Sequence, residues 1–206
     1  VTTYYIREAG GNVLGVYEYT QPATGTSASP GNAPMLTEQY IYGSSRVGVY
    51  YPPNTATQGE RILGNKSYEI SDHLGDVRVT LSDYKVPGTS TGVVNSAMDY
   101  FCFGMMMPGR NYNSPLYRYG YSGKEKLNEV MGEGNFVDLG ARGLDTRLGR
   151  TPSPDPAFKE YPSISPYAYV VNNPINAIDP DGKRDYFVGG AVLHTKGWNY
   201  THTWGY

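Results

Sequence analysis

The residues best suited to chemistry in this chain are four aspartates in its C-terminal half. Asp155 and Asp179 each stand before a proline, Asp181 follows the second of them, and Asp145 precedes all three. Two carboxyl groups held close together can share one proton and act as acid and base on a peptide bond. An aspartate before proline can instead start a turn through its side-chain oxygen. Spacing along the chain leaves both interpretations open.

Other reactive residue types are few. His194 and His202 are eight positions apart, which places them on one face if the segment is a strand, but two histidines without a third ligand make a poor zinc site. His73 lies in a turn-like segment, where we expect a structural role. Cys102 lies in the apolar run 98–109 and is expected to be a buried, inert thiol. No phosphate-binding glycine loop, nucleophile elbow or zinc-protease motif is present, so we expect neither a metal nor a cofactor.

A repeat indicates the elements that must position these residues. Residues 4–13 and 68–77 can be superposed, and each contains a glycine followed by Asn or Asp, which is typical of a hairpin turn. A repeated hairpin cannot bury its own face alone and must pack against its neighbours. The matched positions are Tyr4 and Tyr68, Glu8 and Asp72, Gly11 and Gly75, Asn12 and Asp76, and Val13 and Val77.

Composition favours an all-β fold. The chain has 206 residues, and its 21 tyrosines far outnumber its 5 phenylalanines and 2 tryptophans. Tyrosine suits a half-buried pleated surface, with its ring packed and its hydroxyl in water. The 26 glycines and 15 prolines fall between apolar and aromatic runs, as turns do. Only residues 124–132 have clear helical propensity, for at most two turns.

Charge and cysteine content exclude several functions. A net charge of −2 gives no electrostatic case for binding nucleic acid or an anionic membrane. One cysteine excludes an internal disulfide, and no apolar run approaches the roughly 18 residues of a membrane span. The chain begins inside a strand-like pattern without a signal peptide, which indicates a fragment of a longer polypeptide.

Residues 117–182 carry the motifs that resemble a known family. The runs YGYSGKE, DLGARGLDTRLGR, SPDP and SPYAYVVNNPINAIDPDG follow one another in this order. Together they resemble the rearrangement-hotspot (RHS) repeat-associated core. The hairpin at 68–77 resembles the tyrosine–aspartate (YD) repeat of the same family. Residues 98–109 resemble its D-Y-x-P-F-G-M-x-M-P-G-R segment, with Cys102 in place of the proline.

The resemblance implies a division of the chain and a role for it. Residues 1–116 would be YD-repeat hairpins, 117–182 the RHS core, and 183–206 the start of a variable extension. Family members are similar to hollow shells in which a β-strip spirals around a C-terminal toxin. The implied partners are therefore that toxin segment and the rest of the shell, with no nucleic acid and no membrane span. The implied location is outside a bacterial cell or on its surface, within a longer protein.

The resemblance also implies a candidate for self-cleavage. Many RHS cores resemble aspartyl autoproteases that cut just after a terminal D-P-x-G motif, which here runs from Asp179 through Asp181 to Gly182. Asp155 matches the position usually implicated in the cut. Three departures weigh against cleavage: Thr146 stands where the family motif D-P-R-x-G-R-[WF] has proline, Thr151 replaces its bulky aromatic residue, and Lys183 replaces the usual leucine. We therefore expect the chain to stay continuous across Gly182–Lys183.

A different class of function also fits the composition. Aromatic platforms beside Asn- and Asp-containing loops would suit a surface adhesion or carbohydrate-binding β module. The two hypotheses differ in where the tyrosines lie, because a shell would place them on the strands facing inward and a lectin would cluster them at loop tips. In a shell fragment the cut sheet would leave unpaired strand edges, so we expect the isolated chain to self-associate.

Overall fold

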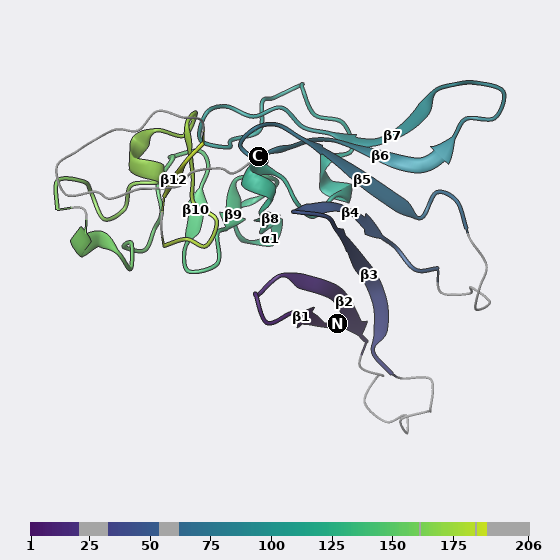
Figure 1. Cartoon of the computed structure of the whole chain (residues 1–206), viewed down its shortest axis with the longest axis horizontal. Coiled ribbons are helices and arrows are strands. Elements are labelled where there is room, and N and C mark those ends of the chain that lie inside the picture. The colour runs from purple at the N-terminus through teal and green to yellow at the C-terminus, as the bar shows by residue number, and fades with distance from the viewer. Residues whose placement is uncertain (21–32, 54–61, 161, 184, 189–206) are drawn as a thin grey trace. The chain divides into compact units, whose positions relative to one another are not determined.

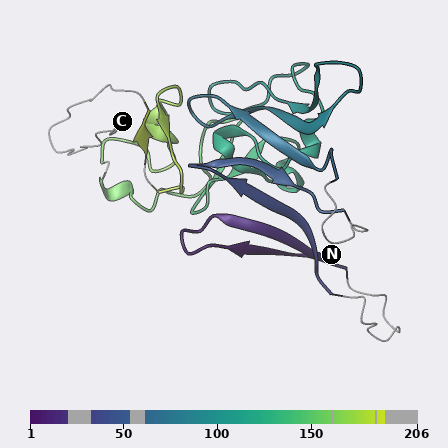
Figure 2. The same ribbon diagram turned by 45° about the vertical axis from the view of Figure 1, so that its right-hand side comes forward.

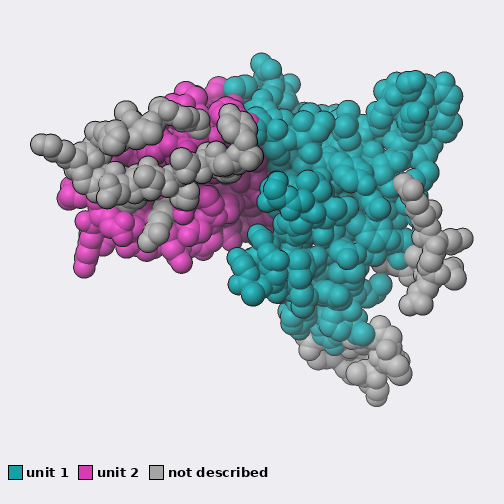
Figure 3. Space-filling model, in the orientation of Figure 1, with its two compact units in different colours: residues 1–72, 77–99, 107–117 teal, residues 73–76, 100–106, 118–206 magenta. Residues whose placement is uncertain are grey.

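The computed structural model describes residues 1–20, 33–53, 62–160, 162–183 and 185–188. His194, His202 and most of the expected extension therefore lie outside the described residues. The chain divides into two compact units, coloured separately in Figure 3. The first comprises residues 1–72, 77–99 and 107–117, and the second comprises residues 73–76, 100–106 and 118–206.

The first unit is built on a seven-stranded antiparallel sheet. Its strands follow one another in chain order, so that each inner strand pairs with its predecessor and its successor, and β1 and β7 stand at the two ends. Figure 1 labels this meander and Figure 2 shows it from a second direction. The strands are β1 (Thr2–Arg7), β2 (Val13–Tyr19), β3 (Met35–Tyr42), β4 (Arg46–Tyr50), β5 (Lys66–Ser71), β6 (Val77–Lys85) and β7 (Gly92–Ala97). A single-turn helix, η1 (Ser114–Leu116), follows later in the chain.

The two repeated segments form hairpins of the same geometry. In β1–β2, Arg7 pairs with Val13 after an irregularity in register, and in β5–β6, Ser71 pairs with Val77 after the same irregularity. Gly11 and Gly75 both have positive φ, at +90° and +80°, in the connecting turns. These are conformations that residues with a Cβ adopt only at a cost. Tyr4 and Tyr68 lie at matching strand positions and are both exposed, and Asp72 approaches Arg78 at 3.9 Å in the second copy.

One face of this sheet is buried, and it carries both apolar side chains and polar side chains that are hydrogen-bonded. Val16, Tyr40 and Val49 are buried there, on three consecutive strands. Further along the sheet, Thr80 and Ser96 pair across β6 and β7 with their hydroxyls 2.7 Å apart. A buried hydroxyl costs free energy unless it is hydrogen-bonded, so this pairing makes a polar sheet face compatible with burial.

The second unit consists of short strands and tight turns. Its three-stranded sheet has the order β10-β9-β8, and a separate two-stranded ladder joins β11 to β12. Its largest fully buried side chains include Tyr169, Leu139 and Leu144. The elements are β8 (Glu125–Lys126), β9 (Phe136–Asp138), β10 (Gly143–Asp145), β11 (Ala177–Ile178), β12 (Tyr186–Phe187), the helix α1 (Asn128–Met131), and the single turns η2 (Tyr121–Gly123), η3 (Phe158–Glu160) and η4 (Val170–Asn172).

Two expectations from the sequence are corrected here. The helix expected over residues 124–132 is limited to α1, because Glu125–Lys126 pairs with β9 as a strand. Cys102 is exposed, not buried. It lies in a tight turn, closed by a 2.8 Å hydrogen bond from Gly104 N to Phe101 O, so the apolar run there marks a turn and not a core strand. Among the residues that the structure describes, none of the helices has the length and apolar character that a membrane crossing requires.

Candidate functional site

The centre of the candidate site is a buried arginine. Arg142 directly precedes β10, and the backbone fixes it there through a 2.9 Å hydrogen bond from Leu139 N to Arg142 O. Its side chain has no exposed surface. A guanidinium stays charged in a protein, so burying one requires anionic partners close by.

Two of the aspartates singled out from the sequence supply those partners. Asp155 Oδ2 lies 2.9 Å from Arg142 Nη1, and Asp179 Oδ2 lies 2.6 Å from Arg142 Nη2. The carbonyl of Ala168 accepts a further, longer bond of 3.4 Å from Nη1. One guanidinium therefore brings together two carboxylates that are far apart in sequence, each bound through a different nitrogen.

Asp155 also closes a turn. Its Oδ1 accepts a 2.7 Å hydrogen bond from Ala157 N, and its own backbone N–H donates to Pro166 O at 2.7 Å. One carboxylate oxygen of Asp155, Oδ1, therefore closes the turn, and the other, Oδ2, binds Arg142. Thr151, shortly before Asp155 in the chain, is buried, and its hydroxyl donates a hydrogen bond to Ser153 O at 2.9 Å. This position is therefore packed and hydrogen-bonded although it lacks an aromatic ring.

The D-P-D-G motif forms a turn whose last amide is held by two carboxylates. Lys183 N donates to Asp179 Oδ1 at 3.0 Å and to Asp181 Oδ1 at 3.1 Å. Asp181 is exposed and does not reach Arg142, so it serves the turn alone, while its carbonyl accepts from Ala141 N at 3.1 Å. Gly182 has a φ of +75° and leaves no room for a side chain, because a Cβ would lie 2.9 Å from Arg142 N.

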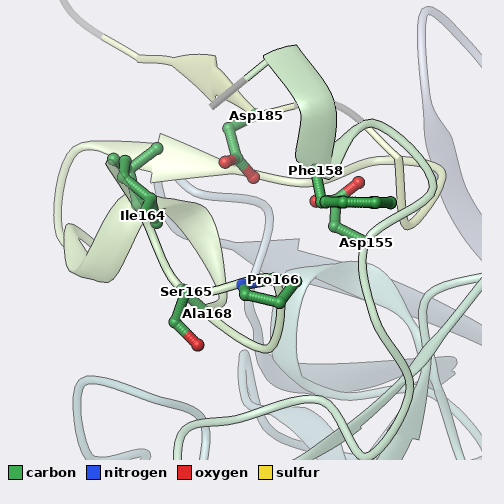
Figure 4. A pocket seen from close by; sticks show the side chains of 8 residues that line it. Asp155, Phe158, Ile164, Ser165, Pro166, Ala168 and Asp185 are labelled. Atoms are coloured by element: carbon green, nitrogen blue, oxygen red, sulfur yellow. The ribbon is translucent and has the colours of Figure 1, made fainter. Parts of the chain in front are cut away.

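A third carboxyl that sequence reasoning missed faces the same place. Asp185 is only 8% exposed and, within the described residues, its Oδ1 has no hydrogen-bond partner. It lines a small pocket with Asp155 and the ring of Phe158, where Figure 4 shows its carboxyl directed inward. Burial, and after it the negative charge of Asp179, raise the pKa of Asp185 to about 7. An isolated acidic residue after the motif gave no signal in the sequence.

We call Arg142, Asp155, Asp179 and Asp185 the Arg142 cluster. With all four ionised it would bury one positive and three negative charges. Protonation of Asp185 removes a charge that burial disfavours most and that the negative charge of Asp179 disfavours further, so both effects raise its pKa. The cluster can therefore hold one proton close to the two carboxylates that bind Arg142, and such a group of carboxyls could in principle exchange a proton with a nearby bond.

The wall of the pocket includes strained backbone. Val170, Val171 and Asn172 in η4 have consecutive positive φ values of 43°, 56° and 58°. Such angles are unfavourable for β-branched residues and persist only where the surrounding structure enforces them. Val171 lines the pocket, so this strain lies at the cluster itself.

The remaining candidates lie elsewhere. Asp145 pairs with Arg147 at 2.8 Å instead of joining the cluster, and this partner holds the pKa of the Asp145 carboxyl below its usual range. His73 is exposed, with its Nε2 3.3 Å from the carbonyl oxygen of Ile175. In the described part of the chain, no group of three or more His, Cys, Asp or Glu is arranged to hold a metal ion.

Comparisons with known proteins support the fold of the chain but do not show which family it belongs to. No family model matches the chain. Over 182 residues, 87% of its length, the chain is 30% identical to Salivary gland surface protein 1 of Aedes aegypti, of which it covers 4%. Its fold resembles TcdB2-TccC3 without the hypervariable C-terminal region (TM-score 0.51, 17% identity) and TcdB2-TccC3-Cdc42 (TM-score 0.53, 17% identity).

These matches cover 87% and 88% of this chain and 9% of each larger one. The chain thus corresponds to a small part of each protein that it resembles. The likeness confirms the expected fold class, an all-β arrangement of repeated antiparallel hairpins with very little helix.

Proposed function

We propose that the chain is a wall segment of a closed β-shell of the RHS type, whose second unit marks the end of the shell. The observation that carries this proposal is the seven-stranded meander with two geometrically equivalent hairpins, in a fold that resembles part of TcdB2-TccC3 over most of the chain. A meander in chain order can be extended at either end by further hairpins, which is what a spiral wall requires.

The tyrosines support a wall more than a lectin. Among the described residues, Tyr4, Tyr5, Tyr68 and Tyr84 are exposed on strands of the seven-stranded sheet, whereas Tyr112 and Tyr167 are exposed outside the strands. Tyr4 and Tyr68 lie on the face of the sheet opposite buried Val16 and Val49, because neighbouring strand residues alternate between faces. An exposed aromatic face of this kind is typical of a surface that contacts another polypeptide. A surface adhesion module remains the second candidate, favoured by the name of the mosquito relative, a surface protein.

The partner in this proposal is the polypeptide that follows Gly182. The segment would be a toxin carried by a longer parent protein that acts outside the cell or at its surface. The core would separate that segment from the shell. Support comes from the order of the family-like motifs, which place the D-P-D-G turn at the end of the core, and from the burial of Asp179, which fixes that turn.

Self-cleavage is a separate question, and we predict that the chain stays continuous. Hydrolysis after Gly182 would add water across the Gly182–Lys183 bond, with a hydroxyl on the carbonyl carbon and a proton on Lys183 N. Asp179 instead binds Arg142 through Oδ2 and accepts the Lys183 N–H at Oδ1. In this geometry both oxygens of Asp179 act as acceptors, so Asp179 presents no proton to the leaving nitrogen.

Intact-mass measurement of the purified chain should therefore give a single uncut species. Asp155→Asn should leave that mass pattern unchanged apart from the substitution itself. A cut directly after Gly182 that Asp155→Asn abolishes would contradict this prediction and show an active autoprotease.

The shell proposal is tested by the edge of the sheet. In the described structure β1 pairs with β2 alone, so the isolated chain should associate through β1 in a concentration-dependent way. Ile6→Lys places a charge on this edge strand and should reduce the association, measured by analytical ultracentrifugation. Ile70→Lys is the matched control, because Ile6 and Ile70 occupy equivalent hairpin positions with 50% and 51% exposure, but β5 has neighbours on both sides.

The control should associate like the unchanged chain. If that chain is monomeric at high concentration, its sheet is complete without neighbours and the wall proposal fails. Equal effects of the two lysines would show that association depends on apolar surface and not on the open edge.

A further inference from the structure

The residues that follow the D-P-D-G turn fold back onto the core. In β12, Tyr186 pairs with Ile178 and Phe187 with Ala177 of β11. Val188 N then donates a 2.7 Å hydrogen bond to Asn176 O. A two-residue ladder is too short to be stable alone, so another contact must hold this segment in place.

Asp185 directly precedes the ladder and supplies that contact. Its side chain is buried in the pocket beside Asp155, where the other lining residues are mostly apolar. The charged groups that face it are Asp179, Arg142 and Asp155. Arg142 is already bound to both of the other carboxylates, so an ionised Asp185 would add a negative charge that no cation in the described cluster balances.

We propose that Asp185 is a proton-dependent anchor, which docks the segment 185–188 against the core in its neutral form and loosens it when ionised. The Arg142 cluster is then a binding site for one protonated carboxyl group on an extended peptide, and the ligand is the chain's own segment after the D-P-D-G turn. The biological role of this anchor rests on the proposed function, because the segment 185–188 is the beginning of an enclosed partner only if the chain is part of a shell.

The direction of the pH dependence follows from the raised pKa. An undocked Asp185 has the ordinary pKa of 3.8, whereas the docked residue keeps its proton to about pH 7. Docking is therefore strongest below pH 4, where both forms are protonated. It weakens as the pH rises from about 4 to about 7, by up to about tenfold per pH unit, and levels off above that.

Hydrogen exchange of the full chain tests the anchor. The protection of the amides in β11, β12 and Val188 is measured from pH 5 to pH 8, after division by the intrinsic exchange rate at each pH. Between pH 5 and pH 7 we expect the protection of these amides to fall on the order of a hundredfold, the expected tenfold per unit over two units. The amides of β9 and β10 serve as the internal reference and should change much less.

Two variants separate the anchor from general effects of pH. Asp185→Asn cannot ionise and should make the protection of β12 independent of pH over the same range. Asp181→Asn removes an exposed carboxylate from the same turn and should leave the wild-type profile. If Asp185→Asn disturbs folding, carbon-13 NMR titration of Asp185 in the unchanged chain still decides, with a midpoint near 7 expected.

A midpoint near 4, or the same pH profile in wild type and Asp185→Asn, would overturn the proposal. Neither result depends on whether the chain lines a shell, because both concern only the docking of 185–188. Conversely, a failure of the edge-strand test would remove the shell and leave the anchor standing.

Discussion

Replacing Arg142 by methionine is expected to lower the free energy of unfolding by about 3–5 kcal/mol. Methionine is close to arginine in length and apolar, so the substitution chiefly removes the charge. It leaves Asp155 and Asp179 partly or wholly buried without the cation that binds both of them. The cost arises from the uncompensated buried carboxylates more than from the loss of favourable attraction.

Arg147→Met is the matched control for this substitution. Arg147 also pairs with an aspartate at 2.8 Å, but its side chain is 44% exposed, and water screens the pair. Chemical denaturation of both variants at neutral pH should show a large loss for Arg142→Met and a small change for Arg147→Met. Losses of equal size would mean that the Arg142 cluster is not the buried centre described above.

Gly182→Ala is expected to lower the free energy of unfolding by about 2–5 kcal/mol, from two causes. Its φ of +75° is unfavourable for any residue with a Cβ. The added Cβ would also lie 2.9 Å from Arg142 N and 3.0 Å from Ala141 N, so the backbone that positions the guanidinium must move. Backbone atoms cannot move aside as the end of a flexible side chain can.

Gly75→Ala separates these two causes. Gly75 has a similar φ of +80°, but a Cβ there meets no atom within 4 Å. Only the conformational cost applies, about 1–2 kcal/mol. Thermal or chemical denaturation of the two variants gives the difference directly. If Gly75→Ala is as damaging as Gly182→Ala, close packing of the D-P-D-G turn on Arg142 contributes nothing.

The hairpin repeat could be predicted from the sequence because its signal is local. A turn glycine followed by Asn or Asp, with tyrosine at a fixed distance before it, determines both the bend and the facing of the strands. The structure gives Gly11 and Gly75 the same conformation and the two hairpins the same irregularity in register. A pattern that encodes its own geometry over ten residues needs no knowledge of the rest of the fold.

The candidate site could be predicted only in part, because its geometry is not local. Asp155 and Asp179 stood out by residue type, but nothing in their spacing indicated that both bind Arg142. Arg142 lies between glycine-rich neighbours, a setting in which an arginine is more often exposed. Asp185 became part of the site through the pairing of β12 with β11, which two-residue strands do not reveal in sequence.

Cys102 shows the opposite error. Its apolar neighbours suggested burial, yet the residue is exposed because the run bends in a tight turn. Gly104 has a φ of +90°, and the ring of Tyr121 packs where a side chain at this position would lie. Apolar composition predicts that a segment contacts a core, but not which of its side chains point inward.

If this chain is one stretch of a closed β-wall, electron cryomicroscopy of the intact parent protein should show the wall continuing beyond it. The proposal predicts that β1 is hydrogen-bonded to a preceding strand of the same wall, and that the exposed face carrying Tyr4 and Tyr68 borders an enclosed chamber holding the segment that follows Gly182. A map in which the β1 edge and the tyrosine-bearing face are both open to solvent, with the C-terminal segment outside, would contradict it.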